Sequence, residues 1–288
     1  MHSLLELQAL RHERWGQTPN TRLADAAAAP ALIDRLGIAT LFQASPEIPN
    51  LYHAYMGDPT AKTEMQWDTP TGTVYTWRWT LGRQGVAFYT TLVCRRSTWV
   101  SWQLLPAVLR LCAEWRMPDE LYDGGALSAD AYRITQALEE AGGTLSTAEL
   151  RKQANFPTGK ASRAAYLKAL EELEIRMLVA KFFQTGQDDT YHTLIATRYQ
   201  QQLESAQQLS REEALEQLLL TYLPQAVYAV PTVLARHLRL PEAELRAGLA
   251  RLAESGQAET IQLVEQKGVC YLWLDAAAQV ELLKASPL

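Results

Sequence analysis

Few residues of this chain stand at a spacing that could support catalysis. Gln66 and Asp68 flank Trp67, and an amide and a carboxylate placed in this way could orient a water molecule for attack. The alternative, which we favour, is a surface loop anchored by the indole ring. The chain contains no phosphate-binding glycine loop, no GxSxG nucleophile motif and no HExxH zinc motif. The motifs therefore give little ground for an enzyme.

The residue types that bind metals are dispersed along the sequence. The five histidines are isolated from one another, and Cys94, Cys112 and Cys270 form no CxxC pair and have no histidine at zinc-binding spacing. We therefore expect no metal, no other cofactor and buried free thiols. With no secretory signal and no apolar run of about 18 residues, the sequence predicts a cytoplasmic protein without a membrane span.

Basic side chains are concentrated in two stretches that contain no acid. One lies between Asp68 and Glu114 and holds five arginines, and the other lies between Glu149 and Glu171 and holds five lysines and arginines. The net charge of −5 and the pI of about 5.6 count against a strong non-specific DNA binder. Because these two stretches contain no acidic side chain that would repel phosphate, we still expect double-stranded DNA to bind there. We predict phosphate contacts from a set of basic side chains: Arg78, Arg95, Arg96, Lys160, Arg163, Lys168 and Lys181.

Tryptophan is concentrated in the first of these stretches. Six of the eight tryptophans lie between Trp67 and Trp115. They could form a core of large rings, or an aromatic surface that stacks on bases beside arginine. The alternation in Trp77-Arg78-Trp79 is compatible with both interpretations.

The elements that must position these residues are clearest at 128–198. Three predicted helices begin at Ser128, at Ser146 or Thr147, and after Gly159. Two β-like runs, 177–183 and 191–197, then flank a polar hairpin turn. This order is typical of a winged-helix domain, in which the third helix of a helix-turn-helix enters the DNA major groove.

The same order of elements returns at 210–274, where a hairpin turn is predicted at 265–268. Before the central unit, we predict two short helices within 26–41, broken at Pro30 and Gly37, and a strand at 86–95. The predicted fold is α+β, mainly α, with tandem winged helices and short β-hairpin wings. Its domains are a winged-helix-like region rich in Trp and Arg (1–126), a central winged helix (127–200), and a C-terminal winged helix with a linker helix (201–288). Because this last unit is the more acidic, it could form a homodimer.

A family resemblance lies in three parts of the sequence. The stretches 142–150, 168–173 and 190–198 resemble the winged-helix core of the bacterial AlkZ/YcaQ-type DNA glycosylases, and 33–38 and 56–59 resemble that family's first region. Val100-Ser101-Trp102-Gln103-Leu104-Leu105-Pro106 looks like the branch described as AlkZ-related. The resemblance implies tandem winged helices that act in DNA repair on alkylated or crosslinked bases, without metal or cofactor.

The sequence departs from this family at its catalytic motif. The family carries Gln-apolar-Gln or Gln-apolar-Asp, and the resemblance aligns Thr40-Leu41-Phe42 with it. Thr40 lacks the amide and Phe42 cannot accept a proton; the nearest polar pair is Gln43 with Ser45. We therefore favour a DNA-binding protein without base-excision chemistry. Two alternatives stay open: a glycosylase with a displaced site at Gln43, Gln66 or Asp68, and a protein-interaction module or transcriptional regulator.

Overall fold

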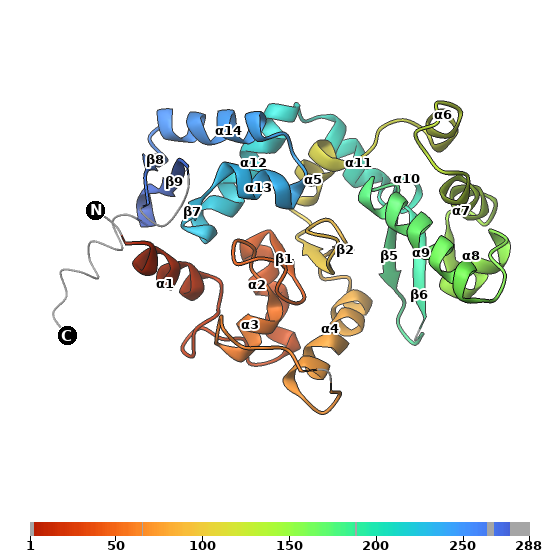
Figure 1. Ribbon diagram of the computed structural model, residues 1–288, viewed down its shortest axis with the longest axis horizontal. Coiled ribbons are helices and arrows are strands. Elements are labelled where there is room, and N and C mark those ends of the chain that lie inside the picture. Colours follow the sequence, from red (N-terminus) through yellow and green to blue (C-terminus); the bar gives the residue numbers. More distant parts are fainter. Residues whose placement is uncertain (1–2, 65, 188, 264–267, 277–288) are drawn as a thin grey trace.

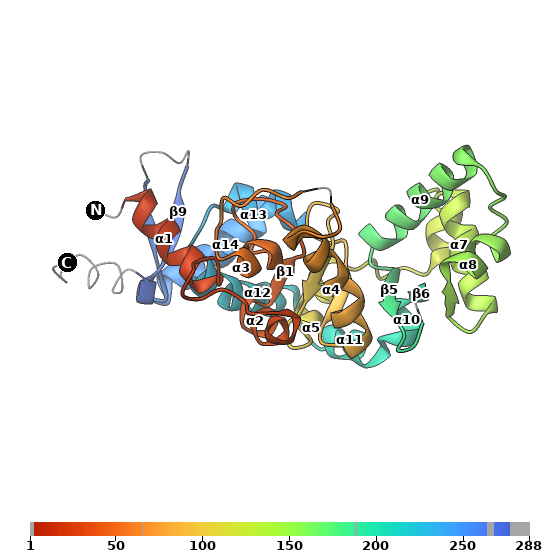
Figure 2. The same cartoon turned by 90° about the horizontal axis from the view of Figure 1, so that it is seen from below.

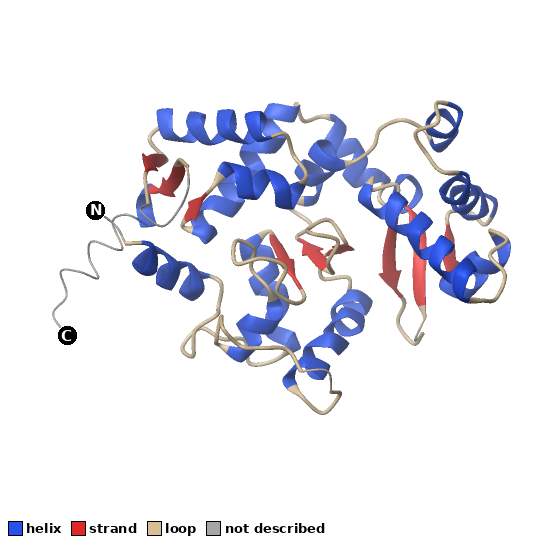
Figure 3. Cartoon of the chain, in the orientation of Figure 1, coloured by secondary structure: helices blue, strands red, loops and turns tan. Residues whose placement is uncertain are grey.

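The computed structural model describes residues 3–64, 66–187, 189–263 and 268–276. The fold is mainly helical with three small antiparallel sheets, which confirms the predicted α+β class (Figure 3). Two views at right angles show an elongated molecule in which α6 to α9 lie at one end, far from α1 and β9 (Figures 1 and 2). Within the described ranges, no helix combines the length and apolarity needed to cross a membrane.

The N-terminal part of the chain folds around a three-stranded sheet of order β1-β3-β2. Its elements are α1 (Leu4–Arg14), η1 (Ala26–Ala28), α2 (Ala29–Leu36), β1 (Ile38–Thr40), α3 (Leu51–Met56), α4 (Pro70–Gln84), β2 (Phe88–Thr90), β3 (Thr98–Val100) and α5 (Leu105–Cys112). Thr69 caps α4 through a hydrogen bond from the backbone N–H of Gly72, and Gly85 ends the helix in the left-handed conformation.

Two elements of this part differ from the sequence prediction. The two short helices predicted within 26–41 are present as η1 and α2: α2 begins one residue before Pro30, which lies in its first turn, where the missing N–H costs no hydrogen bond. Gly37 has a φ of +73° and ends α2, and the residues after it form β1 because they pair with β3. The predicted strand at 86–95 is only β2, because the chain turns after Thr90 and Cys94 and Arg95 take positive φ. Cys94 is exposed there, so the prediction of buried thiols is wrong for it.

The central part folds around a sheet of order β4-β6-β5. Its elements are α6 (Pro118–Asp123), α7 (Ala129–Glu140), β4 (Thr144–Ser146), α8 (Thr147–Gln153), α9 (Lys160–Ile175), β5 (Val179–Phe183), β6 (Thr190–Leu194) and α10 (Ile195–Arg198). Ser128 caps α7, and Ser146 caps α8 with Glu149 in a reciprocal capping box, as the sequence indicated. The turn between β5 and β6 includes Asp188, which lies outside the described residues.

The C-terminal part folds around a sheet of order β7-β9-β8. Its elements are α11 (Gln200–Gln207), α12 (Arg211–Ala226), β7 (Tyr228–Ala229), α13 (Pro231–Leu238), α14 (Glu242–Glu254), β8 (Ala258–Ile261) and β9 (Cys270–Trp273). The capping box of Ser210 with Glu213 begins α12. Most of the hairpin turn predicted at 265–268 lies outside the described residues.

One order of elements therefore occurs three times. In each part the order is helix, strand, helix, helix, strand, strand, and the first strand pairs with the third, which also pairs with the second. The three parts differ in how they pack. The N- and C-terminal parts share one hydrophobic core, in which α5 contacts both α11 and α12, whereas most of the central part packs around a core of its own.

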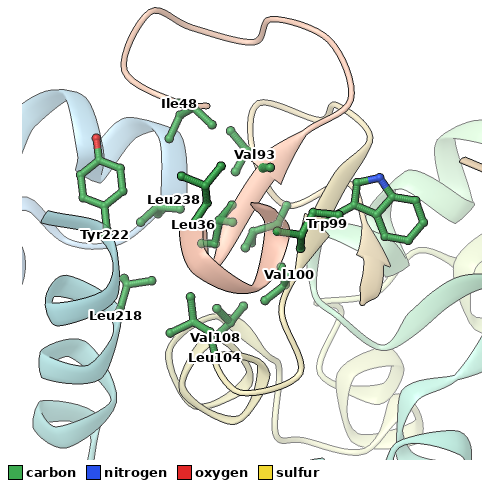
Figure 4. Close-up of a cluster of buried hydrophobic side chains, with 14 of the residues drawn as sticks. Leu36, Ile48, Val93, Trp99, Val100, Leu104, Val108, Leu218, Tyr222 and Leu238 are labelled. Carbon is green, nitrogen blue, oxygen red and sulfur yellow. The ribbon is translucent and has the colours of Figure 1, made fainter. Parts of the chain in front are cut away.

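The shared core is visible where Leu36, Val100 and Val108 of the N-terminal part approach the C-terminal part (Figure 4). Leu218 and Tyr222 of α12 and Leu238 of α13 complete it from the other side (Figure 4). Burial of this many apolar side chains is the main force that holds the two ends of the chain together.

The central part joins this body through β5. A side chain at Gly82 would collide with the ring of Phe183, so glycine is what lets α4 lie this close to β5. The Phe183 ring also packs edge-on against Tyr89 of β2, at 5.5 Å between ring centroids. Beside this joint, Arg83 of α4 donates a hydrogen bond to the carbonyl oxygen of Gln187 in the hairpin. These contacts of Phe183 with Gly82 and Tyr89, which we call the joint, hold α4 and the β2–β3 turn opposite α9.

Candidate nucleic-acid interface

A cavity of about 450 Å³ lies between the central and N-terminal parts, and we call it the α9 cleft. Its walls come from α4, the β2–β3 region, α8, α9, β5 and β6. The lining residues are Arg78, Tyr89, Thr91, Arg95, Ser97, Thr147, Tyr166, Leu167, Leu170, Glu171, Glu174, Lys181, Phe183, Thr190 and His192. Three of the predicted phosphate contacts, Arg78, Arg95 and Lys181, are therefore brought together although they lie far apart in sequence.

A buried ion pair crosses the floor of the cleft. Glu174 of α9 is only 6% exposed, and its Oε1 lies 2.6 Å from Nζ of Lys181 on β5. Its other oxygen accepts a hydrogen bond of 3.0 Å from the hydroxyl of Thr91 in the N-terminal part. A carboxylate at this depth needs such partners, because its desolvation would otherwise cost several kcal/mol. Lys181 therefore neutralises a protein carboxylate, and as packed it is less available for phosphate.

A second ion pair lies at the mouth of the cleft. Nη1 of Arg95 lies 2.9 Å from Oε1 of Glu171 on α9, and both side chains are well exposed. Arg95 has a φ of +58°, which is uncommon for a residue with a side chain and is held by the hydrogen-bonded turn around Thr98. Exposed pairs of this kind contribute about 0–1 kcal/mol, so breaking the pair of Arg95 with Glu171 would cost little.

Arg78 joins the cleft to a stack of aromatic rings on α4. Its guanidinium lies 3.9 Å from the ring centroid of Tyr75 and 3.8 Å from that of Trp79. Tyr75 also packs edge-on against Trp67, which is 71% exposed, whereas Trp77 and Trp99 are buried. The tryptophan-rich stretch thus serves both as core and as surface.

One face of α9 leads from solvent into the cleft. Lys160, Arg163, Leu167, Glu171 and Glu174 follow one another at spacings of three or four residues, which places them on one stripe of the helix. The last three line the cleft, and Lys160 and Arg163 are exposed beyond its mouth. In the described part of the chain, neither of these two basic groups forms an ion pair. Lys168 is exposed on a neighbouring face, and Arg96 is exposed in the turn beside Arg95.

His192 lies deep in the cleft in a defined tautomer. The hydroxyl of Thr147 donates to the carbonyl oxygen of Thr190 at 3.0 Å, so its oxygen must accept from Nε2 of His192, also at 3.0 Å. Nδ1 is then the unprotonated nitrogen. This atom and the hydroxyl of Tyr166 are both buried, and neither has a hydrogen-bond partner among the described residues. An unsatisfied buried polar group costs about 1–3 kcal/mol, which marks both as unusual.

The burial of His192 predicts a pH effect on stability. Burial, with a smaller contribution from the charge of Lys181, lowers the pKa of His192 to about 3. Between the ordinary value of about 6.5 and pH 3, the unfolded chain binds a proton that the folded chain does not. The contribution of His192 to the free energy of unfolding is therefore fully present above about pH 6.5, and below that pH it falls by at most about 1.4 kcal/mol per pH unit. Urea unfolding between pH 4.5 and 7.5 should show a shallower decline for His192→Gln; an equal decline in both proteins would contradict this assignment.

The residues predicted as weak catalytic candidates are not brought together in this cleft. Gln43 is exposed in the loop after β1, and Gln66 and Asp68 are exposed in the loop before α4. Thr40, at the position aligned with the family's catalytic motif, is completely buried and donates to the carbonyl oxygen of Pro49. Phe42 packs against Tyr52. Within the described ranges, no three His, Cys, Asp or Glu side chains are grouped so as to bind a metal.

Sequence reasoning missed Glu174, Tyr166 and His192. Glu174 stands among other acids in 171–174, where nothing distinguishes a buried carboxylate from a solvated one. One signal was present: Glu174 lies four residues after Leu170, an apolar position of α9 that is buried, so the two side chains share one face of the helix. His192 and Lys181 are paired directly across β5 and β6, which a register prediction would have placed on one face.

Comparison with known proteins agrees with the resemblance in the sequence. A family model described as AlkZ related matches residues 23–238, from the end of the first loop to the end of α13. No curated protein and no solved structure matched the chain. The match covers the cleft, all of the central part and the joint with the N-terminal part. The chain therefore belongs to the AlkZ-related family, which relates it to the DNA-repair glycosylases.

Proposed function

We propose that this protein binds double-stranded DNA along the exposed stripe of α9 and the mouth of the α9 cleft. The three repeats of helix, strand, helix, helix, strand, strand would be winged-helix domains, divided at 126/127 and 200/201. In this arrangement α9 is the third helix of the central domain, the one that contacts DNA in helix-turn-helix proteins. The AlkZ-related family supports a role in DNA repair.

The observation that carries the proposal is the charge at the start of α9. The N-terminus of a helix is positive, so acids are favoured in its first turn, as in α7, α8, α12 and α14. α9 has no acid there and begins with Lys160, followed by Arg163. This arrangement costs the helix some stability. A DNA phosphate would relieve it, because both basic groups and the free backbone N–H groups would then face an anion.

We also propose that the protein lacks base-excision chemistry at the family's motif. Thr40 and Phe42 stand where that motif has polar groups, and Thr40 is fully buried. Gln43, the alternative catalytic residue considered from the sequence, lies in an exposed loop. Incubation with alkylated or crosslinked duplexes followed by an abasic-site assay should give no product. Product that Gln43→Ala abolishes would overturn this part of the proposal.

Fluorescence anisotropy with a labelled duplex tests the binding itself. We expect a salt-sensitive complex at about 50 mM salt, because each phosphate contact contributes about −0.9 to the slope of log K against log salt concentration. Lys160→Gln with Arg163→Gln should therefore reduce the slope by about 2 and weaken binding about tenfold or more.

The double variant Arg246→Gln with Arg251→Gln is the matched control. Both arginines lie on α14 of the C-terminal part and are paired, with Glu242 and Glu212, so this variant removes the same two charges from a different helix. It should leave affinity and salt slope unchanged. Absence of any duplex binding at about 50 mM salt, or equal slopes for the wild type and the α9 double variant, would refute the proposal.

A further inference from the structure

We propose that the exposed indole of Trp67 binds single-stranded DNA by stacking on the bases of a strand that continues beyond the duplex. This inference rests on the proposed DNA binding along α9 and adds a class of substrate, a duplex that carries a single-stranded tail. The site lies on α4 and the loop before it. It is separate from the α9 cleft, because none of Trp67, Tyr75 and Trp79 lines that cavity.

Three aromatic side chains form a row along α4, which we call the ring ladder: Trp67, Tyr75 and Trp79. Tyr75 packs edge-on against Trp67, at 5.5 Å between ring centroids, and against Trp79, at 5.4 Å. Tyr75 and Trp79 are four residues apart on the helix, so they share one of its faces. Trp67 stands at the end of the ladder and is 71% exposed, so at least one face of its indole is open to solvent.

The loop before α4 holds Trp67 in this exposed place. Thr69 caps α4, and its hydroxyl donates to the carbonyl oxygen of Gln66 at 2.7 Å. A Cβ at Gly72 would lie 2.0 Å from the carbonyl oxygen of Trp67, so glycine is what lets the backbone of Trp67 pack against the first turn of α4. An indole left in water loses the stabilisation that its burial would bring. A folded loop that keeps it there indicates a binding surface for a flat ring.

The angles between the rings favour a single strand over a duplex. The ring of Tyr75 makes an angle of 76° with Trp67 and of 79° with Trp79, whereas the bases of a duplex follow one another in parallel at about 3.4 Å. Rings at such angles cannot extend one continuous stack of base pairs. They can hold the bases of a flexible single strand one at a time, because every base offers a flat π-face.

Arg78 connects the ring ladder to the proposed DNA surface. Its guanidinium lies 3.9 Å from the ring centroid of Tyr75 and 3.8 Å from that of Trp79, and the same side chain lines the α9 cleft. Arg78 forms no ion pair with the residues that the structure describes, so its charge is available to a phosphate. Helix α4 contains no acidic residue and lies beside β5 of the central part (Figure 1). A strand that leaves the duplex at the cleft would therefore meet Arg78 first and Trp67 at the far end of the ladder.

The charge around Trp67 predicts how salt affects this contact. Glu64 and Asp68 are exposed in the same loop and would repel a nearby phosphate. Ring stacking should therefore provide most of the binding at Trp67. The advantage of a tailed duplex over a blunt one should change little between about 50 and 200 mM salt, whereas duplex binding along α9 should weaken strongly.

Fluorescence anisotropy with three labelled duplexes tests the inference: a blunt duplex and two that carry a tail of about five thymidines, at the 3′ or the 5′ end. The wild-type protein should bind one of the tailed duplexes about five- to tenfold more tightly than the blunt one, an effect at the lower end of that expected for one stacked base. Trp67→Ala should bring this ratio close to one and leave the affinity for the blunt duplex unchanged. Trp67→Phe retains a ring and should keep part of the preference.

Trp115→Ala is the matched control, because Trp115 is also exposed, at 39%, but lies between α5 and α6, outside the ring ladder. It should keep the wild-type ratio. Lys160→Gln with Arg163→Gln should weaken binding of all three duplexes equally. A wild-type ratio near one for both tails, or a ratio that Trp67→Ala leaves intact, would overturn the inference while the proposed DNA binding could stand.

A second arm does not depend on duplex binding. Single-stranded oligothymidine of about ten nucleotides should quench tryptophan fluorescence saturably in the wild type and less in Trp67→Phe. Such quenching without duplex binding would leave the site at Trp67 in place and remove the proposed function. Proline-rich peptides also bind exposed aromatic rings, so quenching by such a peptide and not by oligothymidine would overturn the inference. No binding of either the oligothymidine or the duplexes would overturn both proposals.

Discussion

Replacement of Arg11 by methionine is expected to lower the free energy of unfolding by about 3–5 kcal/mol. Arg11 lies on α1 and is 1% exposed, yet its Nη1 forms an ion pair of 2.7 Å with Glu47. Nε and Nη2 donate to the carbonyl oxygens of Ala226 and Tyr228, at 2.7 and 2.8 Å. One guanidinium thus joins α1, the loop before α3 and the start of β7. Methionine fills the space but removes the positive partner of a largely buried carboxylate and one donor from each of two carbonyls.

Thermal or urea unfolding measures this effect. At about 2–4 °C per kcal/mol, the midpoint of thermal unfolding should fall by roughly 6–20 °C. Arg246→Met is the control, since the exposed pair of Arg246 with Glu242 should contribute less than about 1 kcal/mol. If both substitutions lowered the midpoint equally, the Arg11 pair would contribute no more to stability than an exposed ion pair.

Lys181→Met should produce the second largest loss, about 2–4 kcal/mol. It leaves Glu174 buried beneath the cleft with the Thr91 hydroxyl as its only remaining partner in the described chain. The expected loss is smaller than for Arg11 because Lys181 is itself 28% exposed and water can replace part of its contribution. Urea unfolding at neutral pH gives the value.

A second substitution distinguishes the lost charge from lost packing. Glu174→Gln in the Lys181→Met background makes the buried group neutral, so most of the stability should return. The double-mutant cycle should then give a coupling of at least about 1 kcal/mol between the two side chains. A double variant as unstable as Lys181→Met would mean that the aliphatic part of Lys181, and not its charge, supports the cleft.

The sequence predicted the local features best where their cause is local. N-caps at Ser128, Ser146 and Ser210 begin helices in the structure because a cap requires only a side chain and the next three residues. The same holds for the hairpin of β5 and β6. The strand predicted at 86–95 is too long, because the turn that ends it depends on positive φ at Cys94 and Arg95. Neither residue type predicts a positive φ.

For this protein, the sequence alone determined the α+β class, the succession of helices and hairpins, the family resemblance and the two acid-free basic stretches. The class and the succession of elements follow from neighbours along the chain, and the resemblance and the basic stretches can be read from the order of residues alone. Only the tertiary structure decided that Arg78, Arg95 and Lys181 meet at one cleft and that Glu174 is buried there. It also decided that Lys160 and Arg163 are exposed on the same helical stripe of α9 as three residues that line this cleft. The reason is physical: burial and pairing depend on partners such as Thr91, 83 residues from Glu174, which come together only when distant parts of the chain pack against each other.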